Sequence, residues 1–244
     1  MKPEIIFVTG SDTGVGKTVL AALLTRHLRA SGCCVAGLKP ICSGGRGDAR
    51  ALRQAAGNVL SLDEVNPWHF RAPLAPLLAA RKEGRRVRLR EVVAQIRRLA
   101  GRFEVVVVEG AGGLLSPLGE DFDSRALLRA LRARPIVVCA NRLGAVNQAL
   151  LVLDALPRSL AVPARVVLSA VRADSSRAAN VRLLGELIGA DRVHEQVVGA
   201  PGAAPSGLPL AGRAYVLSGA AGTILTVVDG LLAAGGLLAG KTVT

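Results

Sequence analysis

The segment Gly10–Thr18 (GSDTGVGKT) combines residue types that bind phosphate groups. It follows an apolar run, Ile5–Val8, and it leads into a helical pattern over Thr18–Ala30. Backbone N–H groups of such a loop point at phosphate oxygens, Lys17 neutralises the β- and γ-phosphates, and the Thr18 hydroxyl can bind Mg²⁺. The segment therefore predicts a P-loop that holds ATP, or a similar nucleoside triphosphate, together with Mg²⁺.

The loop is a variant of the strict pattern G-x-x-x-x-G-K-[ST]. That pattern places its first glycine at position 11, where this chain has Ser11, and Gly10 lies one residue earlier. The loop start also lacks the extra lysine of plasmid-partition ATPases, because Ser11 and Asp12 stand there. The residues expected to contact the nucleotide are Asp12, Thr13, Gly14, Val15, Gly16, Lys17 and Thr18, with Glu109 from a later segment.

Two carboxylates are candidate metal ligands beside Thr18. Glu109 ends the apolar run Val105–Val108 and enters a glycine-rich turn, as the second acidic motif of P-loop proteins does. Asp48, in the sequence Gly-Asp-Ala-Arg, fits either a helix N-cap or a third ligand. The sequence thus predicts Mg²⁺ bound by Thr18, Glu109 and, in one of the two readings, Asp48.

Two further segments have polar groups at predicted strand ends. Lys39 and Ser43 follow the apolar run Cys34–Leu38, where an ammonium can stabilise a transferring phosphoryl group or an anionic acceptor. A surface lysine before a proline turn is the alternative for Lys39. The segment Ala140–Leu151 contains a strand end, a tight turn and a helix start; its free N–H groups can hold a carboxylate, or it can be ordinary packing.

The arrangement of apolar runs predicts the elements that carry these residues. Short runs rich in Val and Ile alternate with longer helical patterns, which is typical of a parallel sheet covered on both faces. We therefore expect an α/β fold with one doubly wound, mostly parallel sheet of the P-loop NTPase type, and a single domain over residues 1–244. The expected strands are Ile5–Val8, Cys34–Leu38, Val105–Val108, Ile136–Ala140 and Arg165–Val171.

Composition restricts the classes of partner. The net charge of +13 comes from 31 basic and 18 acidic residues spread along the chain, without a basic tail, so we expect neither nucleic acid nor a membrane as partner. The four cysteines lack zinc-type spacing and are expected to be reduced thiols of a cytoplasmic protein. No signal peptide is expected. The apolar segment Ala220–Gly240 is interpreted as a buried helix, because Asp229 and the glycines Gly230, Gly235 and Gly236 oppose a membrane span.

Taken in order, these motifs resemble those of dethiobiotin synthetase, the ATP-dependent carboxylase of biotin biosynthesis. The similar stretches cover roughly the first 155 residues and are Val8–Thr18, Lys39–Gly44, Asn66–Phe70, Ala72–Pro76, Val108–Gly113 and Leu143–Leu150. The resemblance implies that 7,8-diaminopelargonic acid takes up carbon dioxide as a carbamate. ATP then phosphorylates the carbamate, and the neighbouring amine closes the ureido ring.

The resemblance also implies a role for each matched residue. Lys39, Thr13 and Ser43 would contact the carbamate and the diamine, and Lys17 would contact the phosphates. Thr18, Asp48 and Glu109 would bind Mg²⁺, so the resemblance favours the metal-ligand reading of Asp48. The turn with Leu143, Gly144 and Asn147 would hold the substrate carboxylate from the neighbouring subunit of a homodimer. The substrate-binding set also includes Ser43, Gly110, Gly112 and Gly113.

Three departures from the family pattern accompany this resemblance. The stretch from Lys39 to Asp48 is shorter than usual, and Gln148 stands where a histidine is common. The Asn-Asp pair that reads adenine is absent from Val167–Asp174. The sequence therefore leaves open which base the nucleotide carries.

Two alternative classes remain for comparison. A cobyrinate-type amide ligase shares the fold and the variant loop, but this chain has no room for its glutaminase domain. A partition or septum-positioning ATPase fits the charge of +13. Against this class, such an ATPase has no need for Lys39 and Ser43, and it usually carries the extra lysine at the start of the loop.

Overall fold

The computed structural model describes residues 2–170, 174–198, 215–219 and 222–223. Within these ranges one large sheet has the strand order β10-β9-β8-β7-β6-β1-β5-β2. Its six strands β8, β7, β6, β1, β5 and β2 are parallel to one another. β9 and β10 are added antiparallel at one edge. The strands are β1 Glu4–Gly10, β2 Val35–Leu38, β5 Val105–Glu109, β6 Arg134–Ala140, β7 Arg165–Ala170, β8 Val193–Val198, β9 Tyr215–Gly219 and β10 Gly222–Thr223.

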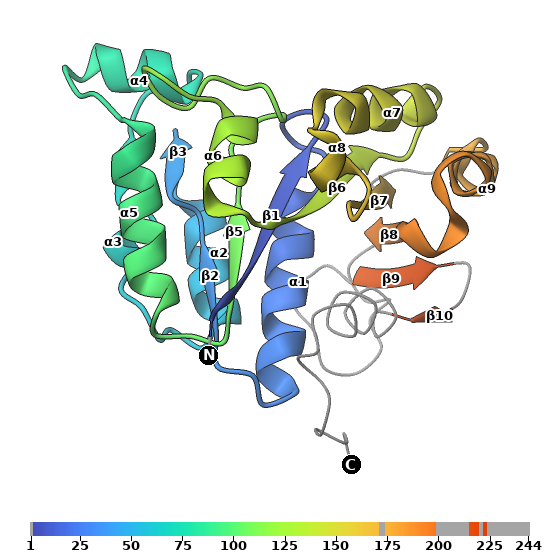
Figure 1. The fold of residues 1–244 in the computed structure, drawn as a ribbon, viewed down its shortest axis with the longest axis horizontal. Helices are drawn as coiled ribbons and strands as arrows, with labels where there is room; N and C mark the ends of the chain where they lie inside the picture. Colours follow the sequence, from blue (N-terminus) through green and yellow to red (C-terminus); the bar gives the residue numbers. More distant parts are fainter. Residues whose placement is uncertain (1, 171–173, 199–214, 220–221, 224–244) are drawn as a thin grey trace.

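Helices pack on both faces of this sheet (Figure 1). A second, two-stranded parallel sheet pairs β3 Ile41–Ser43 with β4 Trp68–Phe70. The helices are α1 Lys17–Ala30, α2 Gly47–Ala55, α3 Leu62–Val65, α4 Pro76–Lys82, α5 Leu89–Ala100, α6 Ser124–Leu131, α7 Ala145–Ala155, α8 Arg158–Ala161 and α9 Arg177–Ile188, with a 3-10 turn at Ala190–Arg192. The expected α/β fold with a mostly parallel sheet is confirmed.

Alternate residues of the central strands feed two separate cores, because side chains along a strand point to opposite faces. On β1, Ile6 and Val8 pack with the apolar side of α1, whereas Phe7 packs with residues of α5 and α6. On β5, Val105 and Val107 face the first core, and its other two valines face the second. All four valines are fully buried, which explains why this strand reads as an uninterrupted apolar run.

Five expected strands are present, with small shifts at their ends. The sixth parallel strand, β8, was not expected, because its centre is His194-Glu195-Gln196 and gives no apolar run. Gly222–Thr223, within the segment expected to be a buried helix, form the strand β10 instead; the rest of the segment Ala220–Gly240 lies outside the described residues, as does the loop 199–212. The single domain over residues 1–244 stays a prediction.

In the described ranges no helix is both long and apolar enough to cross a bilayer. Cys34, Cys42 and Cys139 are free thiols, as expected from their spacing.

Candidate active site

A cavity of about 890 Å³ lies at the carboxyl ends of β1, β5 and β2. The strand order explains its contents. β5 lies between β1 and β2, so Glu109 at the end of β5 is flanked by the P-loop after β1 and by Lys39 after β2. The cavity is lined by Thr13, Gly14, Gly16, Lys17, Thr18, Val19, Lys39, Cys42, Ser43, Asp48, Pro73, Leu74, Ala75, Pro76, Glu109, Ala111, Gly112, Ser116 and Pro117.

Two glycines are required by the local geometry of the P-loop. A Cβ atom at Gly10 would lie 2.8 Å from the carbonyl oxygen of Val138. Gly16 is the N-cap of α1 with φ +102°, and a Cβ there would lie 2.5 Å from the hydroxyl of Ser169. Both positions need the absence of a side chain, and Gly16 also needs the left-handed backbone region that glycine favours. The loop therefore brings the N-terminus of α1 to the cavity.

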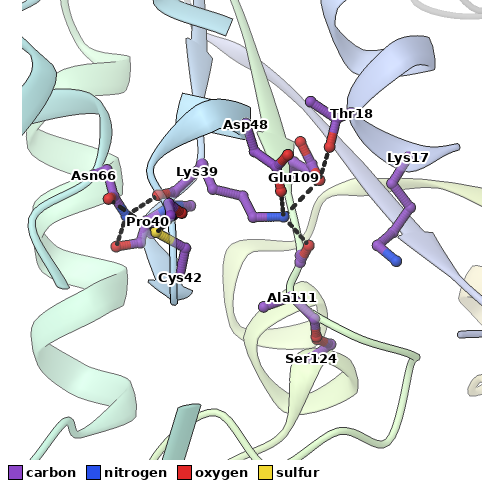
Figure 2. Close-up of polar contacts among 12 residues, drawn as sticks. Lys17, Thr18, Lys39, Pro40, Cys42, Asp48, Asn66, Glu109, Ala111 and Ser124 are labelled. Carbon is purple, nitrogen blue, oxygen red and sulfur yellow. Dashed lines mark hydrogen bonds and ion pairs between the residues drawn. The ribbon is translucent and has the colours of Figure 1, made fainter. Parts of the chain in front are cut away.

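Lys17, the first residue of α1, donates a hydrogen bond of 2.5 Å from Nζ to the carbonyl oxygen of Asp12. Its ammonium is thus folded back over the loop, and Figure 2 shows it beside Thr18. Burial, followed by the positive charge of Lys39, lowers the pKa of Lys17 to about 8. A nearby anionic ligand would oppose both effects, since opposite charge favours the protonated amine.

Lys39 occupies the centre of the site (Figure 2). Its Nζ lies 2.5 Å from Glu109 Oε1 and 3.2 Å from Asp48 Oδ2, and it donates to the carbonyl oxygen of Gly110 at 3.1 Å. Only 4% of Lys39 is exposed, so the alternative of a surface lysine before a proline turn is wrong. Glu109 is 1% exposed and also accepts a hydrogen bond of 2.8 Å from Thr18 Oγ1.

The charges of this pair are set by burial and by each other. Burial raises the pKa of Glu109, while the ammonium of Lys39 acts in the opposite direction. Burial alone lowers the pKa of Lys39, but the carboxylates of Glu109 and Asp48 more than compensate and raise its pKa above the ordinary value. Lys39 is therefore a permanent cation at neutral pH, held within reach of the cavity.

The residues predicted to bind Mg²⁺ form a donor set that suits this ion. Glu109 Oε2 is buried and has no hydrogen-bond partner in the part of the chain that the structure describes, Thr18 supplies a hydroxyl, and the side chain of Asp48 is 49% exposed. Mg²⁺ is usually bound by one or two carboxylates together with substrate phosphates and water. Among the described residues no group of three His, Cys, Asp or Glu side chains could bind a metal on its own. The three residues thus fit a Mg²⁺ shared with bound phosphates.

Asp48 is the second residue of α2, and Arg46 occupies the N-cap position. The N-cap reading of Asp48 is therefore wrong. Its position in the first turn of a helix still places the carboxylate where the helix dipole stabilises negative charge.

Several predicted site residues do not line the cavity. Val15 is buried, a Cβ at Gly110 would meet the ring of Phe7 at 3.1 Å, and a Cβ at Gly113 would meet the carbonyl oxygen of Ser11 at 3.0 Å. Asp12 accepts a 2.7 Å hydrogen bond from the N–H of Thr13 through its carboxylate. These residues shape the loops, and Gly110 and Asp12 each present a backbone carbonyl oxygen to a lysine.

The turn before α7 does not reach the cavity of its own chain. Leu143 is 81% exposed, Gly144 is the exposed N-cap of α7, and Asn147 borders a separate hollow of about 500 Å³ beside Asp154 and Arg192. The role of these three residues toward a neighbouring subunit stays a prediction.

Some residues of the site had no assigned role in the sequence. Leu74 accepts a 2.5 Å hydrogen bond from Ser43 Oγ through its carbonyl, which fixes the Ser43 hydroxyl at the cavity edge. Pro73, Pro76 and Pro117 add apolar surface to the wall. The Pro-rich segment after residue 72 was the available signal, but prolines alone do not indicate a ligand.

Comparisons with known proteins agree with this geometry. Residues 4–199 match the protein family described as "AAA domain". The ATP-dependent dethiobiotin synthetase of Anaeromyxobacter dehalogenans (strain 2CP-C) is 48% identical over 157 residues, which are 63% of this chain and 70% of that protein. The enzymes of the same name from Akkermansia muciniphila and Methanococcus vannielii are 40% and 37% identical, over 70% and 71% of their lengths and 61% and 62% of this chain.

The chain belongs to the AAA-domain family and to the dethiobiotin synthetases. As a member of the dethiobiotin synthetase family it is an enzyme, a ligase with a P-loop. These relatives do not favour the two alternative classes, the cobyrinate-type ligase and the partition ATPase. Among solved structures, the 54 kDa signal recognition particle protein from Aeropyrum pernix K1 in complex with GDP aligns over 98% of this chain and 47% of that protein chain. The sequence identity is 15% and the TM-score is 0.48, so this similarity supports no functional argument.

Proposed function

We propose that this chain converts 7,8-diaminopelargonic acid, carbon dioxide and ATP into dethiobiotin, ADP and phosphate through a phosphorylated carbamate. The observation that carries the proposal is the buried Lys39 ammonium, which lies between Glu109 and Asp48 beside the P-loop. A nucleotide switch needs the loop, the metal ligands and a γ-phosphate sensor. A buried lysine on the far side of Glu109 suits an enzyme that must also hold an anionic acceptor.

The P-loop and its neighbours account for the nucleotide. The N–H groups of Gly14, Gly16 and the start of α1 would bind the phosphates, and Lys17 would leave the Asp12 carbonyl to bind their outer oxygens. Thr18, Asp48 and Glu109 would hold Mg²⁺, which supplies neutralisation of charge at the β- and γ-phosphate oxygens.

The proposed reaction brings two anions together, the carbamate and the γ-phosphate of ATP, and ends with the release of phosphate. One amine of the substrate adds to carbon dioxide and loses a proton, which gives a carbamate. A carbamate oxygen attacks the γ-phosphorus, the bond to the β-phosphate oxygen breaks, and ADP leaves. The second amine attacks the carbamate carbon, the carbon–oxygen bond to phosphate breaks, and the ring closes with loss of a proton.

The lysines are suited to the charged stages of this sequence. Lys39 would face the carbamate, because its ammonium remains protonated and its neighbours Thr13 and Ser43 line the same cavity. Lys17 would stabilise charge on the transferring phosphoryl group. Preorganised cations at the position of developing charge are the main source of rate in phosphoryl transfer.

The rest of the substrate needs an apolar wall and an anion site. Pro73, Leu74 and Pro117 line the cavity and suit the aliphatic chain. The carboxylate would be bound by Leu143, Gly144 and Asn147 of a second copy in a homodimer, since this turn lies away from the cavity of its own chain. A purified chain that stays monomeric at assay concentration would contradict the homodimer.

The experiment is a turnover assay with diaminopelargonate, bicarbonate and Mg²⁺, in which ATP, CTP and GTP are compared in parallel. We expect dethiobiotin and nucleoside diphosphate in equal amounts, and no product from the Lys17→Ala variant. Absence of dethiobiotin with all three nucleotides would refute the proposal. Retention on DNA that falls with salt, in the absence of turnover, would instead favour the partition ATPase.

A further inference from the structure

Asn66 is a buried polar residue that the activity proposed above leaves without a role. It follows α3 and is 1% exposed. Its Nδ2 donates to the carbonyl oxygen of Lys39 at 2.7 Å and, more weakly, to that of Pro40 at 3.4 Å. Its Oδ1 accepts hydrogen bonds from Cys42 Sγ and from Arg46 Nε, both at 3.1 Å. Figure 2 shows this amide on the side of Lys39 that faces away from Glu109.

Arg46 connects the same amide to the other end of the segment 39–48. Besides its bond to Asn66 Oδ1, its guanidinium donates to the carbonyl oxygens of Leu62 and Asn66 at 2.8 and 3.0 Å, and it pairs with Asp63 at 2.8 Å. Arg46 is also the N-cap residue of α2, and Asp48 follows two positions later. The Asn66 side chain is thus bonded at both ends of the segment that supplies Lys39 and Asp48.

The backbone around Asn66 adds two further bonds to the Lys39 turn. The N–H of Lys39 donates to the carbonyl oxygen of Val65, and the N–H of Trp68 donates to that of Pro40, each at 3.1 Å. The backbone of Lys39 is therefore held on both sides of its Cα, and the Nδ2 bond of Asn66 fixes the intervening carbonyl. A lysine side chain has four rotatable bonds, so a fixed backbone is needed to aim its ammonium.

We propose that Asn66 is a positioning residue that aims the Lys39 ammonium by fixing the backbone of the segment 39–48; this rests on the proposed function of Lys39. Asn66 does not line the cavity, so it acts through Lys39 and not by touching a ligand. A displacement of about 1 Å in a catalytic group can cost about 100-fold in rate.

Asn66→Asp keeps the acceptor oxygen of this side chain and removes the Nδ2 donor. The carboxylate still accepts from Arg46 and Cys42, so the contact that supports the fold is kept. Its second oxygen faces the Lys39 carbonyl oxygen, which accepts a hydrogen bond in the native chain, and the two acceptors repel. Ser61→Ala is the matched control: it removes the capping box of the same short helix, in which Ser61 Oγ accepts from the N–H of Glu64, without touching Lys39.

The test measures kcat for dethiobiotin formation, KM for ATP and the melting temperature of the native chain, Asn66→Asp and Ser61→Ala. We expect Asn66→Asp to lower kcat at least ten-fold and to change the KM for ATP less than three-fold. Ser61→Ala should keep kcat within two-fold despite a lower melting temperature. If Asn66→Asp does not fold, Asn66→Ser, which is neutral and too short for both bonds, takes its place with the same expectation.

Two results would overturn the inference. One is a kcat for the Asn66 variant within two-fold of the native value. The other is an equal loss of kcat in Ser61→Ala at a similar melting temperature, which would mean general loosening of the fold. Absence of product from the native chain would instead remove the proposed function, and the inference with it.

Discussion

Replacing Lys39 with methionine leaves the Glu109 carboxylate buried without the cation that faces it. The side chains are similar in length, so the change removes charge with little change in volume. The native Lys39 Nζ lies 2.5 Å from Glu109 Oε1 and 3.2 Å from Asp48 Oδ2. Asp48 can still meet solvent, since its side chain is half-exposed, whereas Glu109 is 1% exposed. Glu109 therefore bears most of the cost.

The magnitude follows from the distance and the burial. At 2.5 Å and an effective dielectric constant of about 20, the attraction between Lys39 and Glu109 is about 6–7 kcal/mol before desolvation. Removing one partner of a buried pair costs about 3–5 kcal/mol in free energy of unfolding. For a chain of this size each kcal/mol shifts the melting temperature by about 2–4 °C. We expect Lys39→Met to melt roughly 6–20 °C lower at pH 7.5.

The loss should depend on pH with a defined sign. Burial already raises the pKa of Glu109, and removing Lys39 raises it further. A carboxyl group whose folded pKa lies above its unfolded value of 4.5 binds more protons when folded, so the stability of the variant falls as pH rises above 4.5. The loss in free energy of unfolding relative to the native chain should be smaller at pH 5.5 than at pH 7.5, by up to about 1.4 kcal/mol per pH unit.

The assay is thermal unfolding of both chains at pH 5.5 and 7.5. Lys82→Met on α4 is the control, because it makes the same chemical change at an exposed site, where shifts are about 0.5 kcal/mol or less. A Lys39→Met chain within about 1 kcal/mol of the native chain at pH 7.5, or with the same deficit at both pH values, would refute the reasoning.

Three other changes test the remaining parts of the site. Lys17→Met should weaken ATP binding about 10- to 150-fold by calorimetry, since a charged hydrogen bond contributes about 1.5–3 kcal/mol; three-fold weakening or less would contradict this. The pKa of Lys17 is about 8 in the folded chain and 10.5 in the unfolded chain. Without nucleotide, the free energy of unfolding of the native chain should therefore rise relative to that of Lys17→Met between pH 8 and 10.5, by about 3 kcal/mol at most. A difference that stays constant over this pH range would be the contrary result. Gly16→Ala should destabilise the chain more than Gly32→Ala, because both have positive φ but only Gly16 has an atom within 2.5 Å of the added Cβ; equal melting temperatures would argue against that clash. Glu109→Gln should raise the Mg²⁺ concentration needed for half-maximal turnover about ten-fold or more, and an unchanged value would exclude Glu109 as a ligand.

The sequence predicts those parts of the fold in which side-chain character and burial agree. β5 is buried on both faces, so its valines form an apolar run, and the P-loop has a fixed pattern between a strand and a helix. β8 differs, because it is a strand with His194, Glu195 and Gln196 at its centre. Its pairing with β7 is a tertiary effect that no local apolar pattern indicates.

The sequence singled out Lys17, Lys39 and Glu109 as candidate site residues, but it did not indicate how their charges are arranged. Lys39 and Glu109 are far apart in sequence and become neighbours because β2 pairs with β5. The sequence alone left Lys39 equally open to a surface position, and Asp48 open to capping. Asn66 belongs to a recognisable stretch, yet its bonds to Lys39 and Arg46 depend on how α3 packs against that turn. Such long-range contacts decide which polar residues serve the site.

Phosphorylation of a carbamate at this site would transfer an oxygen of carbon dioxide to the released phosphate. The most direct test supplies bicarbonate labelled with heavy oxygen, in ordinary water, immediately before ATP, Mg²⁺ and diaminopelargonate, and analyses the products by mass spectrometry. We expect one labelled oxygen in the released phosphate for each labelled ureido carbonyl of dethiobiotin, because the carbamate oxygen that attacks the γ-phosphorus leaves with it. Dethiobiotin formed with phosphate free of label would contradict phosphorylation of a carbamate.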